Sequence, residues 1–188
     1  GCQVSAAYLH NQRFGKKIAV MDSERGSASL YEGRPGIPPF DVCELEAATL
    51  QDYLARISEA AAAGYDVLII DSFSHSWTSA LETVDKMGGW VKAGKVISPR
   101  VAALVQAILS YPGHVIATMR SKTEYVIDKD AAGKTTMKKM GLAPQARNDT
   151  EYEFTIVLDL TKEGTITVEK SRLDAALPGY AACFDKLW

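Results

Sequence analysis

Hydrophobic and polar positions follow one another along this chain in blocks that predict strands and helices in turn. Continuous apolar runs at residues 16–22, 66–71 and 114–120 are typical of strands that are buried on both faces. Residues 49–64 and 98–113 instead carry apolar side chains at helical spacing, each between a capping hydroxyl and a closing glycine. This alternation predicts a three-layer α/β domain, with a mostly parallel sheet that helices cover on both faces.

The last third of the chain has a different pattern, in which apolar and polar residues alternate around polar turns. Residues 123–140 and 151–172 are each predicted to form an antiparallel hairpin, and we expect the hairpins to extend one edge of the sheet. A helix at residues 4–15 and a short strand at 41–46 complete the prediction. No linker interrupts the chain, so residues 1–188 are expected to form a single domain.

Polar side chains follow three of the predicted buried strands. The carboxyl ends of parallel strands meet at one edge of a sheet, where ligands bind in a crevice. A solvated rim is the alternative interpretation, because a single polar strand end is common, but three such ends favour a site. The residues at these ends are Asp22, Glu24, Asp71, Ser72, Thr118 and Arg120.

The overall charge and composition exclude some functions. A formal net charge of −2 gives no global attraction to nucleic acids or membranes, so any such site has to be local. No apolar run approaches the roughly 20 residues that span a bilayer, and no membrane partner is expected. Three widely spaced cysteines favour reduced thiols and a cytoplasmic protein. The three histidines lack metal-ligand spacing, which favours structural or surface roles for them.

Several segments, taken together in their order and spacing, resemble RecA-like ATP-binding proteins of the P-loop NTPase superfamily, to which AAA ATPases also belong. The likeness is greatest to a small phage group linked to single-strand annealing and recombination. It extends from about Lys16 to Arg172. The segments are KIAVMDSERGSASLY, GYDVLIIDSFSHSW, HVIATMRSKTEYV, GLAPQARNDTEYEFTIVLDL and TVEKSR.

The resemblance implies roles for residues of the predicted crevice. Asp71 matches the Walker B acid, which binds the magnesium ion of Mg-ATP, often through water. Glu24 matches the glutamate that orients or deprotonates the attacking water, and Arg120 lies where the family senses the γ-phosphate. Ser72, directly after the Walker B acid, is a further candidate for nucleotide binding.

Lys170 and Arg172 match a basic pair of the same family. Their spacing of two puts both on one face of a predicted strand. In RecA-like filaments such a pair reaches the nucleotide of the neighbouring subunit. The alternative interpretation is a strand face that is simply exposed to solvent.

The sequence contains no GxxxxGK-S/T phosphate loop. The segment AAGKTT at residues 131–136 contains GKT, but it lacks the first glycine and lies in a predicted hairpin. The resemblance instead places the last loop positions on Gly1, Cys2 and Gln3, so the chain is N-terminally truncated relative to the family. Cysteine cannot supply the positive charge of the missing lysine. ATP binding is therefore expected to be weak or absent, without appreciable hydrolysis.

Seven basic residues against three acidic ones between Arg120 and Arg147 give this segment a local charge of about +4. The resemblance implies that a DNA-contacting loop lies here, and Tyr125 is a candidate to stack on a base of single-stranded DNA. A solvated hairpin whose lysines protect its edge is the alternative. The candidate nucleic-acid residues are Lys122, Tyr125, Lys134, Lys138, Lys139 and Arg147.

Three functions stay open at this point. The first is a non-hydrolysing relative that acts on single-stranded DNA in recombination. The second is an active ATPase whose phosphate loop is encoded upstream, and the third is a protein-interaction remnant with an exposed sheet edge. The strand that precedes the loop is central in the family. Its absence predicts either a homo-oligomer or a rearranged sheet, in which the strands at Ala19 and Leu68 close up.

Overall fold

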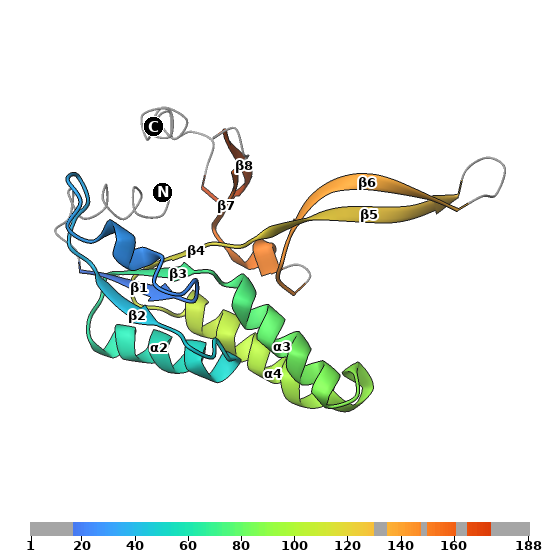
Figure 1. Ribbon diagram of the computed structural model, residues 1–188, viewed down its shortest axis with the longest axis horizontal. Coiled ribbons are helices and arrows are strands. Elements are labelled where there is room, and N and C mark those ends of the chain that lie inside the picture. The colour runs from blue at the N-terminus through green and yellow to red at the C-terminus, as the bar shows by residue number, and fades with distance from the viewer. Residues whose placement is uncertain (1–16, 130–134, 148–149, 161–164, 174–188) are drawn as a thin grey trace.

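The computed structural model describes residues 17–129, 135–147, 150–160 and 165–173. Its centre is a parallel four-stranded sheet with the strand order β2-β1-β3-β4 (Figure 1). The strands are β1 (Ile18–Asp22), β2 (Asp41–Glu44), β3 (Val67–Asp71) and β4 (His114–Ala117). The first four residues of β3 are apolar and only the last, Asp71, is polar. The apolar run fits a strand that is covered on both faces and paired on both edges. The predicted α/β architecture with a parallel sheet is confirmed.

The two strands at Ala19 and Leu68 are direct neighbours. Ala19 lies opposite Leu68 in the β1–β3 register, and Asp22 lies opposite Asp71. The described sheet therefore has no gap between these strands. This agrees with the predicted alternative of a rearranged sheet in which the two strands close up. The homo-oligomer stays a prediction, because the structure describes one chain.

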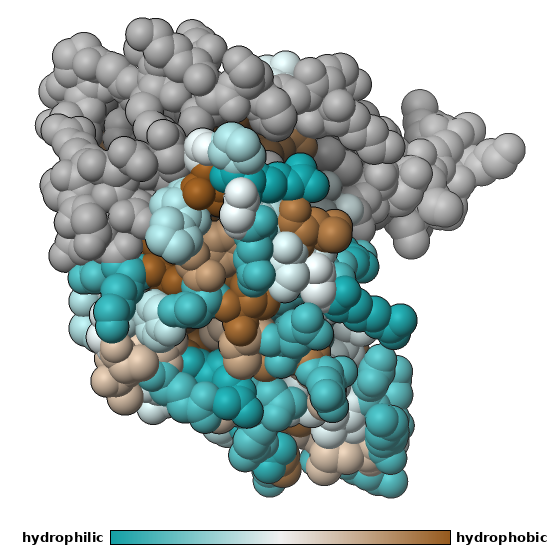
Figure 2. All heavy atoms as spheres, turned by 60° about the vertical axis from the view of Figure 1, so that its left-hand side comes forward, coloured by the Kyte–Doolittle hydropathy of each residue, from teal (hydrophilic) through white to brown (hydrophobic). Residues whose placement is uncertain are grey.

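Three α-helices lie together on one side of the sheet, below it in Figure 1. They are α2 (Leu50–Ala62), α3 (Ser74–Lys86) and α4 (Trp90–Leu109). Thr49 caps α2 as predicted, and its side chain and that of Asp52 form a reciprocal capping box. The buried stripes of the helices pack against Met21, Leu68 and Ile70 of the sheet. The outer surface of this layer, in the lower half of Figure 2, is mostly hydrophilic.

Helix α4 begins earlier than its sequence predicts. Ser98 and Pro99 were expected to start it, but the helix starts at Trp90 and continues through Pro99. A proline inside a helix removes one backbone hydrogen bond. The buried contacts of Ala93 and Ile97 before it, and of Val101 after it, keep the axis on the core.

The other face of the sheet carries a smaller apolar cluster. Ile18, Val20, Val67 and Ile69 point to this side and pack against Ala28 of the 3-10 helix η1 (Ala28–Tyr31). Phe40, Val42 and Ile116 border the same cluster. The helix predicted at residues 4–15 lies outside the described residues.

Both predicted hairpins are present. They are β5 (Ser121–Lys129) with β6 (Thr135–Pro144), and β7 (Ile156–Leu160) with β8 (Ile166–Ser171), separated by the 3-10 helix η2 (Thr150–Glu153). Each hairpin forms its own two-stranded sheet and does not continue the four-stranded one. The β5–β6 ribbon projects from the body as a long arm (Figure 1). No helix in the described part of the chain is long and apolar enough to cross a membrane.

Gly113 and Gly94 form a matched pair that tests this packing. A Cβ atom on Gly113 would lie 2.4 Å from the carbonyl oxygen of Asp66, so Gly113→Ala forces the backbone apart where β3 begins. A Cβ on Gly94 meets only the Trp90 ring, at 3.8 Å, in the interior of α4. We expect Gly113→Ala to destabilise the fold by about 2 kcal/mol and Gly94→Ala to stabilise it by about 0.5–1 kcal/mol. Urea unfolding measures both, and equal signs would contradict the described packing.

Candidate active site

Backbone hydrogen bonds draw the ends of β1, β3 and β4 together. The Ser23 N–H donates to the carbonyl of Asp71 (2.7 Å), and the Phe73 N–H donates to the carbonyl of Thr118 (2.8 Å). These bonds continue the parallel ladder past the last strand residues. The structure therefore brings the polar residues that were predicted to share a crevice to one edge of the sheet.

Glu24 and Arg120 form a two-pronged ion pair at this edge. The Arg120 Nε donates to Glu24 Oε1 at 3.2 Å, and Nη2 donates to Oε2 at 2.5 Å. The Glu24 side chain is 25% exposed, whereas that of Arg120 is 54% exposed. Burial raises the pKa of Glu24, but the hydrogen bonds and charge of Arg120, together with His75 and Ser72, lower it by more. The pKa of Glu24 is therefore lowered, and its carboxylate is charged at neutral pH.

His75 is a member of this cluster that the sequence did not indicate. It lies in the first turn of α3, and its Nε2 is 3.7 Å from Glu24 Oε1. Its Nδ1 is 2.8 Å from the Ser23 hydroxyl oxygen. That hydroxyl also accepts the Ser72 N–H, at 2.9 Å, so Ser23 joins three segments of the chain. No sequence motif relates His75 to Glu24, because the two residues are far apart in the chain and meet only through the placement of α3.

Asp71, the last residue of β3, and Ser72, the next residue, have different surroundings. The Asp71 Oδ1 accepts the Thr118 hydroxyl at 2.8 Å. The Ser72 carbonyl accepts the hydroxyl of Tyr53 from α2 at 2.6 Å, and burial raises the pKa of Tyr53 to about 12, so this donor stays protonated. The Ser72 hydroxyl is buried and has no hydrogen-bond partner among the described residues. It is still close enough to Glu24 to help lower the pKa of that carboxyl group.

These groups fit a divalent cation that arrives with phosphate. No group of three or more His, Cys, Asp or Glu side chains within the described ranges could hold a metal ion alone. Magnesium, however, binds through one or two carboxylates and takes its other ligands from phosphates and water. Asp71 offers such a carboxylate, and the unpartnered Ser72 hydroxyl is an adjacent oxygen.

A pocket of about 560 Å³ adjoins the cluster and is bordered by Ser23 and His75. Its walls carry the acidic side chains of Glu44, Glu46 and Glu82, against the single arginine Arg25. This excess of carboxylates repels phosphate. This pocket is therefore a poor site for a phosphate group.

Lys170 and Arg172 lie apart from the Glu24 cluster. The Lys170 ammonium donates to the carbonyls of Tyr152 and Phe154 and lies 5.6 Å from the centre of the Tyr152 ring. Arg172 Nη2 also donates to the Tyr152 carbonyl, at 2.6 Å. Both cations thus cap the end of η2, and no described hydrogen bond or ion pair links them to Glu24. Their reach toward a neighbouring nucleotide stays a prediction.

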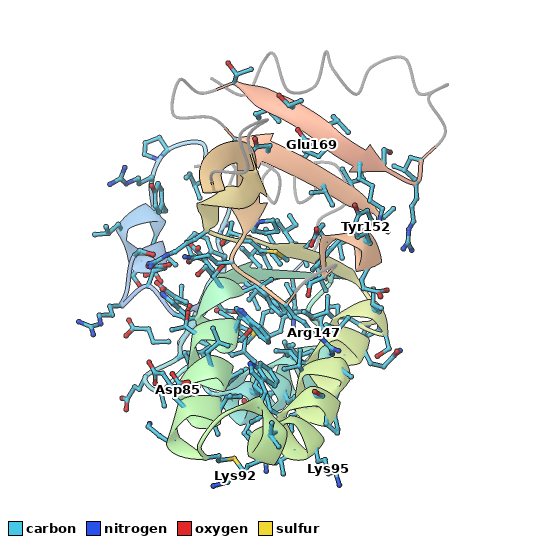
Figure 3. All side chains as sticks on the ribbon, turned by 90° about the vertical axis from the view of Figure 1, so that its right-hand side faces the viewer. Asp85, Lys92, Lys95, Arg147, Tyr152 and Glu169 are labelled. Carbon is cyan, nitrogen blue, oxygen red and sulfur yellow. The ribbon has the colours of Figure 1, made fainter. Side chains whose placement is uncertain are left out.

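The predicted nucleic-acid residues are spread along the arm and its base. Lys122 and Tyr125 lie on β5, and Lys138 and Lys139 lie on β6, with Tyr125 opposite Lys139 in the register. Arg147 is exposed between β6 and η2 (Figure 3). Lys134 lies outside the described residues, as do the expected loop positions Gly1, Cys2 and Gln3.

The ion pair predicts a pH-dependent loss of stability in Arg120→Gln. The lowered pKa of Glu24 means that the pair stabilises the fold above the pKa of an unfolded glutamate, and that this stabilisation disappears as the pH falls through the folded pKa. Because Arg120 is largely exposed, we expect a difference of about 1 kcal/mol or less at pH 7, and none at an acidic pH below the lowered pKa of Glu24. Urea unfolding at both pH values measures it, with Arg56→Gln, which breaks the exposed pair with Glu59, as the control. An equal difference at both pH values would show that Glu24 is not the partner.

Comparison with known proteins agrees with this geometry. A family model described as an AAA domain matches residues 6–176. No curated protein matches the chain. The family model covers well over half of the sequence and includes the ends of β1, β3 and β4. The chain therefore belongs to the AAA domain family, whose members are P-loop ATPase-like domains.

Proposed function

We propose that the carboxyl edge of the sheet is the magnesium and phosphate end of a nucleotide site. The observation that carries this proposal is the charge arrangement at that edge. The Asp71 carboxylate ends β3, and the Glu24 carboxylate follows the neighbouring strand β1 and pairs with the guanidinium of Arg120. Phosphoryl transfer needs such positioned charges and little covalent chemistry from the protein.

Each residue has a distinct part in this proposal. Asp71, oriented by the Thr118 hydroxyl, would hold a magnesium ion through the water molecules around it. Glu24 orients a water molecule for attack and, as a charged carboxylate, is able to take its proton. Arg120 supplies the positive charge that a terminal phosphate requires. Mg-ATP, when bound, supplies the remaining charge neutralisation.

The proposal includes weak binding by this 188-residue chain. No GxxxxGK-S/T occurs in the sequence, so the backbone N–H cradle and the lysine of a phosphate loop have no counterpart in it. The positive charge that the described residues offer at this edge is that of Arg120, which is already paired with Glu24. A longer protein with a phosphate loop ahead of residue 1 would bind and hydrolyse ATP by the same edge.

Asp71→Asn tests the metal site. We expect the chain to bind Mg-ATP more weakly than low-micromolar, and the substitution to lower the magnesium-dependent part of that affinity about tenfold. Calorimetric titrations with millimolar Mg-ATP and with ATP plus a chelator measure the two affinities, and their difference is the magnesium-dependent part. Asp85→Asn, an exposed acid on α3, is the matched control and should change nothing. Equal affinities in Asp71→Asn and the parent chain would rule out Asp71 as the metal-binding acid.

The β5–β6 arm supports a second candidate function, single-stranded DNA binding of the kind found in phage RecA-like recombination proteins. The arm starts directly after Arg120, so it leaves the body at the proposed nucleotide edge. Lysines occur on both of its strands, and its register sets an aromatic residue opposite one of them. Basic ribbons with aromatic side chains hold single strands by phosphate contacts and stacking.

Reversing the charge of Lys138 and Lys139 to Glu tests the arm. Two phosphate contacts would be lost, so the slope of log K against log salt should fall by about 1.4. Fluorescence anisotropy with labelled oligo-dT at several salt concentrations measures this slope. Lys92→Glu with Lys95→Glu is the control, since these lysines lie at the far end of α4 from the sheet (Figure 3). If both double variants lose the same salt dependence, DNA binding is diffuse and the arm is not its site.

A further inference from the structure

Asp22 is the most deeply buried carboxylate in the described part of the chain. It ends β1 and is 1% exposed. A buried charge is costly unless hydrogen bonds satisfy it. All described hydrogen bonds to the Asp22 carboxylate come from the loop that follows β1. Glu24 belongs to the same loop.

The two oxygens of Asp22 hold that loop at two points. Oδ1 accepts the backbone N–H of Glu24 at 2.6 Å, and Oδ2 accepts the backbone N–H of Ala28 at 2.8 Å. The Ser27 hydroxyl lies at the limit of a hydrogen bond, 3.5 Å from Oδ2. Within the described residues no cation pairs with Asp22. Backbone dipoles are therefore its counter-charge.

The loop needs such a hold because its backbone is strained. Arg25 has a φ of +57° and is followed by Gly26 at +82°, so two successive residues take the left-handed conformation. Arginine adopts this conformation at a cost that surrounding contacts have to offset. The bonds to Glu24 and Ala28 stand on either side of the strained pair and close the turn.

The hold on the Glu24 N–H also sets the direction of the Glu24 side chain. With its backbone fixed to Asp22, the carboxylate meets Arg120 from the end of β4 and His75 from α3. A cap that served the start of η1 alone would use the Ala28 N–H and leave Glu24 free. Instead, Oδ1 of Asp22 accepts the N–H of Glu24 itself.

We propose that Asp22 is a positioning residue for Glu24, whose buried carboxylate aims the candidate base across the edge of the sheet. The inference rests on the proposed function for what Glu24 does there, but the contact between the two residues is independent of it. Asn cannot replace Asp here, because its amide nitrogen would face a second N–H donor in place of an acceptor.

The test compares Asp22→Asn with Ser27→Ala, which removes only the long contact to the same carboxylate. Carbon-13 NMR follows the titration of the Glu24 carboxyl group, identified by its loss in Glu24→Gln. In Asp22→Asn the pKa of Glu24 should rise toward the ordinary value of a glutamate, since the carboxylate no longer stays aligned with Arg120. In Ser27→Ala it should stay lowered. An unchanged titration in folded Asp22→Asn would overturn the proposal.

A measurement on the unsubstituted protein covers the case in which Asp22→Asn does not fold. The amides of Glu24 and Ala28 should be protected from hydrogen exchange at neutral pH, although they lie in a loop. Free exchange at Glu24 would overturn the proposal. Failure of the proposed function has a different signature: the parent chain would bind no Mg-ATP, whereas the shift of the Glu24 titration would persist.

Discussion

Asp22 and Asp71 lie opposite each other because β1 and β3 pair in parallel from Ile18 and Val67 onward. A slip of one residue would turn every side chain of a strand to the other face. The apolar pattern forbids that slip, since Ile18 and Val20 belong to one cluster and Met21 to the other. The arrangement of acids at the edge is thus a consequence of how the two cores are filled.

The charges at this edge contribute less to stability than to geometry. The Glu24–Arg120 pair is partly solvated, and pairs of this kind are worth little to the fold. Its value lies in the direction that it gives to both groups. One guanidinium holds one carboxylate at rest, and an anion of phosphate charge would compete for the same donors. In the described structure, the carboxylate of Glu24 already takes up donors of the Arg120 guanidinium.

The apolar periodicity predicted the parallel sheet, α2 and both hairpins, because those elements depend on local spacing. It missed the true start of α4, since Pro99 is a strong signal for a helix start and the core contacts of Ala93 and Ile97 override it. Polar strand ends predicted that Glu24, Asp71 and Arg120 would lie at one edge of the sheet, where Glu24 and Arg120 form an ion pair.

The remaining features of the site depend on tertiary contacts that a single sequence does not encode in any motif. His75 enters the cluster through the placement of α3, and Lys170 is engaged by the carbonyls of η2. The fold of the hairpins was likewise predictable from alternation, whereas their separation from the main sheet was not, because no local pattern decides whether an edge strand is continued.

The hydroxyl of Tyr53 links the helix layer to the candidate site. Tyr53 lies on α2, fully buried, and its bond to the Ser72 carbonyl passes from that layer to the edge of the sheet. A segment that shares a buried hydrogen bond with a site cannot open without disturbing it. Helix α2 and the end of β3 are therefore expected to behave as one cooperative unit in native-state fluctuations. The candidate site would then owe its rigidity to a helix that contributes no side chain to the Glu24–Arg120 cluster.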